Sequence, residues 1–197
     1  KLNDYIKASG DLAVKLYKED IEAALRTKDF GGFELLSLSD YTGQSKATVG
    51  ILDVFYDSKG LISHDEFKNF AGEAVPLFKA KRIFKNTDTL EAELDLYDFG
   101  EKKINNPVYN LTVQNGKQVF YKTSTTESKV SIPLNSITKS TMLSVILEVN
   151  GYKNTWRIFV FGENKIENNV RMIKSEEELY DIIKNGGKAI VTKECFK

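Results

Sequence analysis

The chain has 197 residues, 41% of them hydrophobic and 28% charged, which is the composition of an ordinary soluble globular protein. Lys and Arg together number 28, as do Asp and Glu, so the net charge is zero and a nucleic-acid partner is disfavoured. One cysteine and one histidine exclude an intrachain disulfide and a His-rich metal cluster, and neither a membrane span nor a signal peptide is expected.

The first 75 residues combine helical periodicity with one apolar stretch that predicts a strand. Residues 17–26 carry apolar side chains on one helical face and charges on the other, which predicts an amphipathic helix. Gly31-Gly32 ends that pattern, and the apolar residues 33–38 predict a buried strand, so an α/β unit with a parallel sheet is favoured. Residues 48–56 predict a short helix, and Ser63 to Glu66 form a capping box that opens another.

Between residues 76 and 161 the apolar period changes to two, which is typical of half-buried antiparallel strands. Asn115-Gly116 and Asn150-Gly151 each separate two such runs and predict hairpins, because both residue types tolerate a positive φ. About seven short strands at this spacing favour an immunoglobulin-like antiparallel β-sandwich.

After residue 170 the pattern returns to α/β. Val170 to Ile173 predict a strand, Ser175 caps a helix, and Gly186 ends that helix in a left-handed conformation. Leu179, Ile182 and Ile183 are expected on the buried face of the helix, and residues 189–191 predict a second strand.

The candidate site lies where the predicted strand 33–38 ends. The polar turn that follows carries Asp40, Tyr41 and Gln44, and in parallel α/β sheets the C-terminal strand ends carry the site. The alternative is that Asp40 and Gln44 only satisfy backbone groups of the turn. His64 to Glu66 do not predict a metal or acid–base cluster, because adjacent residues in a first helical turn point in different directions.

Several motifs occur in a fixed order along the first 77 residues. They are Tyr17-Lys18-Glu19-Asp20-Ile21-Glu22-Ala23-Ala24-Leu25-Arg26-Thr27, Gly32-Phe33-Glu34-Leu35-Leu36, Asp40-Tyr41-Thr42-Gly43-Gln44, Val49-Gly50-Ile51-Leu52-Asp53, Asp57-Ser58-Lys59-Gly60 and Val75-Pro76-Leu77. Together they resemble the end of the catalytic barrel in large multidomain glycosidases related to glycoside hydrolase family 2, the β-galactosidase and β-glucuronidase group. The likeness continues through the predicted sandwich and the C-terminal unit.

The resemblance implies a piece of a retaining glycosidase that is secreted or periplasmic and acts on an oligo- or polysaccharide. Residues 33–38 would be the last barrel strand, and the two catalytic glutamates would lie before Lys1, so no catalytic residue is expected in this chain. Asp40, Tyr41 and Gln44 would line the sugar pocket. Neither a cofactor nor a metal is implied.

The expected fold class is therefore α+β and multidomain. Residues 1–75 would be the tail of a (β/α)8 barrel, residues 76–162 the immunoglobulin-like sandwich, and residues 163–197 the start of a further α/β unit. A lone barrel strand lacks neighbours on both sides, so self-association of the chain is expected.

A non-catalytic carbohydrate-binding or structural spacer module is the alternative function. An exposed Trp156 or Tyr152 would favour sugar binding, and a buried pair would favour a spacer. Trp156 shares a strand face with Ile158 and Val160, which predicts that it belongs to the core.

Overall fold

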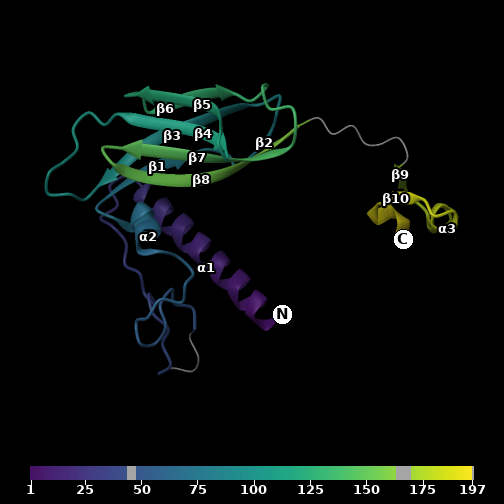
Figure 1. The fold of residues 1–197 in the computed structure, drawn as a ribbon, viewed down its shortest axis with the longest axis horizontal. Helices are drawn as coiled ribbons and strands as arrows, with labels where there is room; N and C mark the ends of the chain where they lie inside the picture. Colours follow the sequence, from purple (N-terminus) through teal and green to yellow (C-terminus); the bar gives the residue numbers. More distant parts are fainter. Residues whose placement is uncertain (44–47, 163–169, 197) are drawn as a thin grey trace.

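The computed structural model describes residues 1–43, 48–162 and 170–196 as a mixed α+β structure whose larger sheets are mainly antiparallel. The first sheet has the order β1 (Ala74–Lys79), β3 (Thr89–Asp98), β6 (Lys129–Pro133). The second has the order β2 (Ile83–Lys85), β8 (Tyr152–Phe161), β7 (Thr141–Val149), β4 (Tyr109–Asn115), β5 (Gln118–Thr125), with β2 parallel to β8 (Figure 1).

The two sheets share one hydrophobic core, which is the arrangement that a β-sandwich requires. Along β3, Leu90, Ala92 and Leu94 are buried and alternate with exposed residues, as the period of two predicts. Trp156 on β8 is only 3% exposed, so its predicted core position is confirmed.

Both predicted hairpins are present. β4 pairs with β5 across Asn115 and Gln118, and β7 pairs with β8 across Val149 and Tyr152. In the second hairpin Asn150 and Gly151 have φ values of 50° and 86°, which is why this residue pair suits the turn.

Two helices pack against β1. The first helix, α1 (Leu2–Leu25), is longer than the predicted segment, and α2 (His64–Ala71) begins at the predicted capping box of Ser63 and Glu66. Ile21 and Leu25 of α1 form a second core cluster with Phe70, Val75 and Leu77. No helix in the described residues is long and apolar enough to cross a membrane.

The predicted strand 33–38 and the predicted helix 48–56 are wrong. Residues 33–38 form loop and turn, joined to the following loop by one parallel bridge between Ser39 and Leu52, and Leu36 is 85% exposed. A strand needs a neighbour along its whole length, and within this segment only the Leu38 carbonyl accepts backbone hydrogen bonds from the next loop, from the N–H groups of Ile51 and Leu52. In the second segment the Asp53 carboxylate accepts hydrogen bonds from the N–H groups of Phe55 (2.8 Å) and Asp57 (2.9 Å), which stabilises a turn instead of a helix.

The C-terminal unit contains β9 (Val170–Ile173), α3 (Glu176–Lys184), β10 (Lys188–Val191) and a short 3₁₀ helix (Lys193–Phe196). The two strands pair in parallel, and Ser175 caps α3 as predicted. The predicted buried face of the helix is wrong, because α3 has no buried residue. A two-stranded sheet offers too little surface to cover it.

Candidate functional site

Asp40 and Tyr41 lie within the described structure, and Gln44 lies outside it. The Asp40 carboxylate is largely buried and accepts hydrogen bonds from the Gly50 N–H (2.9 Å) and the Lys59 Nζ (2.7 Å). Lys59 Nζ also donates to the Gly50 carbonyl oxygen (2.9 Å). Tyr41 is 57% exposed. The structure therefore brings Asp40 together with Lys59 and Gly50, and not with Tyr41.

Gly50 makes this loop geometry possible because two backbone segments meet there. A Cβ at position 50 would lie 2.3 Å from the carbonyl carbon of Ser39 and 2.4 Å from the Asp40 nitrogen, which no side chain tolerates. The contacts of Asp40 are those expected of a residue that satisfies the turn, and its role in sugar binding stays a prediction.

A polar cluster centred on a fully buried carboxylate lies where α1 meets β8. We call it the Glu22 cluster: Lys18, Glu22, Arg26, Asn154 and Trp156. Glu22 is 0% exposed and accepts from Lys18 Nζ and Asn154 Nδ2 (2.9 Å) on Oε1 and from Trp156 Nε1 (2.8 Å) and Arg26 Nη1 (3.1 Å) on Oε2. These four donors occupy both oxygens, so the carboxylate joins α1 to β8.

Lys18 sits between this carboxylate and two aromatic rings. Its Nζ lies 4.9 Å from the centroid of the Trp156 ring and 5.4 Å from that of Phe70, and it also donates to Asn154 Oδ1. Burial lowers the pKa of the Lys18 ammonium, although the charge of Glu22 opposes that shift. The cation is stabilised by Glu22 and by the ring faces.

The sequence reasoning missed the Glu22 cluster because it assigned every charge of the helix to the exposed face. One signal was available: Glu22 lies beside Ile21 and three residues before Leu25, which places it at the edge of the apolar face. Asn154 likewise falls at the same period of two as Trp156 and Ile158, in the core-facing positions of β8.

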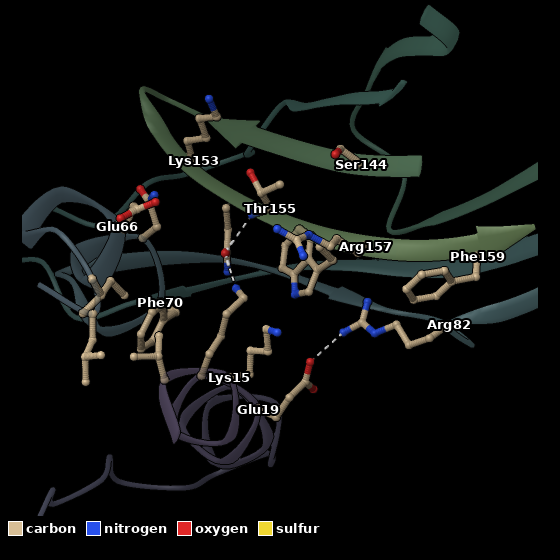
Figure 2. Close-up of a pocket in the computed structure, with 17 residues that line it drawn as sticks. Lys15, Glu19, Glu66, Phe70, Arg82, Ser144, Lys153, Thr155, Arg157 and Phe159 are labelled. Carbon is tan, nitrogen blue, oxygen red and sulfur yellow. Dashed lines mark hydrogen bonds and ion pairs between the residues drawn. The ribbon is translucent and has the colours of Figure 1, made fainter. Parts of the chain in front are cut away.

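A cleft of about 740 Å³ lies beside the Glu22 cluster, between α1, the segment from Leu61 to Phe70, and β8 (Figure 2). Its charged lining consists of five basic side chains, Lys15, Lys18, Arg82, Lys153 and Arg157, and two acidic ones, Glu19 and Glu66. Neither Asp40 nor Tyr41 lines it. The cleft is thus a basic recess on a chain whose net charge is zero.

Among the described residues, no group of three or more His, Cys, Asp or Glu side chains is placed to hold a metal ion. His64 opens α2 beside the capping box, in the position that the sequence assigned to it.

Known proteins resemble this chain in part, at the level of one family model and of solved structures. The model of a domain of unknown function (DUF8488) matches residues 88–162, which span β3 to β8. No curated protein matches the chain. A solved structure, the β-glucosidase from Listeria innocua in complex with glucose, is similar with 9% identity and a TM-score of 0.32. The match covers 46% of this chain and 16% of that one, well under two thirds of its length.

Proposed function

We propose that the chain is the end of the catalytic barrel and the following immunoglobulin-like sandwich of a retaining glycosidase, secreted or periplasmic, with no catalytic carboxylate of its own. Such an enzyme cleaves a glycosidic bond with two carboxylates about 5–5.5 Å apart. The resemblance of residues 17–60 to the family 2 glycosidases supports this proposal, as does one feature of α1.

The helix α1 has apolar residues on two opposite faces. Near its C-terminal end, Ile21 and Leu25 pack on the sandwich side. At about 100° per residue, a second set lies on the opposite face and is 55–73% exposed: Leu2, Tyr5, Ile6, Leu12 and Leu16. A helix with one packed and one uncovered apolar face is suited to lie between two bodies.

This is the situation of an outer helix in a (β/α)8 barrel, which packs on the barrel strands with one face. The Glu22 cluster fixes the other face of α1 to the sandwich. In the proposed enzyme the uncovered face, which includes Leu12 and Leu16, would pack on the barrel. In the isolated chain an apolar surface of this kind favours association with a second copy.

Asp40, Tyr41 and Gln44 keep their proposed place in this enzyme, at the sugar-binding end of the barrel. The alternative module, with Trp156 as a sugar-stacking platform, is not favoured, because that ring is buried and its Nε1 donates to Glu22. A stacking platform needs an exposed ring face.

Light scattering over a concentration series tests the proposal. We expect the chain to associate, the variant Leu12→Glu to associate at least tenfold more weakly, and the control Asn3→Glu, which adds the same charge on another face, to behave as the unchanged chain. A monomeric chain whose residues 2–16 exchange their amide protons slowly would contradict the proposal.

A panel of chromogenic β-glycosides provides the catalytic test. We expect no turnover above buffer by the chain alone, since it holds neither catalytic carboxylate. Hydrolysis that disappears in Asp40→Asn would refute the proposal, because it would place a catalytic group inside this chain.

A further inference from the structure

The cleft beside the Glu22 cluster carries positive charge that the described residues leave unpaired. Lys15 on α1 and Lys153 and Arg157 on β8 line it, and none of the three forms an ion pair within the described part of the chain. Figure 2 shows Lys15 on the helical side of the cleft and Arg157 beside β8, whereas Lys153 projects from the side of β8 away from α1. Cations that line one recess from both sides favour an anionic occupant.

The two carboxylates of the cleft offset this charge only in part, because Glu66 is a single anion against Lys15, Lys153 and Arg157, and Glu19 is already paired. Glu19 is paired with Arg82 at 3.3 Å, and Glu66 accepts the hydrogen bonds of the Ser63 cap. Arg82 itself still has a buried Nη1 without a hydrogen-bond partner. Because this nitrogen is buried, it is not counted among the cations that a ligand can reach.

The uncharged side chains that line the cleft include both apolar and hydrogen-bonding groups. Val14 and Phe159 contribute apolar surface, while Asn69, Ser144 and Thr155 contribute amide and hydroxyl groups. This combination fits a ligand with apolar ring faces and many hydroxyl groups. The volume of about 740 Å³ lies within the usual range for small-molecule sites.

An extended peptide fits less well, although the cleft borders a strand edge. β2 pairs with β8 only from Phe159 to Phe161, so the preceding part of β8 has no strand on that side. The Thr155 N–H on that edge is already bonded to Asn154 Oδ1 (2.8 Å), and Lys18 donates to the same oxygen. A peptide adding as a strand needs those backbone groups, and a buried lysine beside them blocks its approach.

We propose that this cleft binds an acidic oligosaccharide, one bearing carboxylate or sulfate groups, through Lys15, Lys153 and Arg157. The proposed glycosidase function enters only in the choice of a saccharide over other small anions. The planar guanidinium of Arg157 suits two-pronged contact with a carboxylate or sulfate, and the lysines act as point charges.

Isothermal titration of the full chain tests this site with four probes of similar length. They are an oligogalacturonate, a sulfated heparin-derived oligosaccharide, a neutral cello-oligosaccharide and an oligoglutamate peptide. We expect the carboxylated or the sulfated sugar to bind at least tenfold more tightly than the neutral sugar, with affinity that falls as salt is added. The acidic sugar that binds more tightly shows whether the site prefers carboxylate or sulfate groups.

Arg157→Gln should weaken that binding at least tenfold, whereas Lys117→Gln, which removes an exposed cation on the β4–β5 hairpin, should leave it unchanged. Equal binding of neutral and acidic sugars, preference for the peptide, or no effect of Arg157→Gln would each overturn the proposal. So would the absence of binding by every probe. None of these results depends on the uncovered apolar face of α1 that includes Leu12. The light-scattering test of the proposed function is therefore independent of them.

Discussion

Replacing Glu22 by alanine tests whether the Glu22 cluster holds α1 to the sandwich. The change removes a fully buried carboxylate that accepts four hydrogen bonds, and it leaves Lys18 without its anionic partner and Trp156 Nε1 without its acceptor. Breaking a buried ion pair by removing one partner costs about 3–5 kcal/mol. We expect the free energy of unfolding to fall by about that amount, with the N-terminal helix released first.

Urea unfolding followed by fluorescence measures this loss directly, because Trp156 is the single tryptophan and lies in the cluster. The control Asp20→Ala changes an exposed acid of the same helix and should shift stability by less than about 0.5 kcal/mol. The double variant Lys18→Met, Glu22→Leu removes both charges and should recover most of the loss. A loss under about 1 kcal/mol in Glu22→Ala would refute the reasoning. So would a double variant whose loss of stability equals the sum of the losses in Lys18→Met alone and Glu22→Leu alone.

Trp156→Ala should cost about 3–5 kcal/mol, since the ring is buried between α1 and the core; an unchanged urea midpoint would place the ring on the surface. Ser63→Ala should cost about 1 kcal/mol at neutral pH. Hydrogen bonds from the Ser63 N–H and hydroxyl lower the pKa of Glu66, so the Glu66 half of this cap stabilises the fold above pH 4.5 and is lost as the pH falls through the lowered pKa. Urea unfolding of the unchanged chain and of Ser63→Ala, measured from neutral pH to below pH 4.5, should show that their difference in unfolding free energy becomes smaller in acid. Gly50→Ala should break the hydrogen bond to Asp40, because a Cβ would lie 2.3 Å from the Ser39 carbonyl carbon; amide exchange at position 50 that stays slow would contradict this.

The features that the sequence predicted correctly depend on neighbours close along the chain. The alternation from Leu90 to Leu94, the turn at Asn150-Gly151 and the capping box at Ser63 each follow from interactions within a few residues. The predicted strand 33–38 failed because an apolar run becomes a strand only when another segment supplies hydrogen bonds, and composition says nothing of that partner.

The site could be predicted only in part, for the same reason. Asp40 was singled out as a residue of a polar turn, but its partners Gly50 and Lys59 lie 10 and 19 residues away in sequence. Glu22 and Asn154 are 132 residues apart, and each is an isolated polar residue in an apolar pattern. Neither local pattern reveals that the two side chains hydrogen-bond to each other, so the Glu22 cluster is visible only in the three-dimensional structure.

The separation of Glu22 from Trp156 by 134 residues also constrains the order of folding. A ribosome releases α1, α2 and β1 long before β8, so the apolar side of α1 can pack on α2 and β1 while Glu22 still lacks its partners on β8. Contacts between such distant segments form slowly, because the long intervening loop must first be closed. The Glu22 carboxylate gains Asn154 and Trp156 as donors only when β8 presents both residues on its core-facing side. The emission of the single tryptophan therefore reports on the closure of this long-range contact, because its Nε1 meets Glu22 only when α1 and β8 come together.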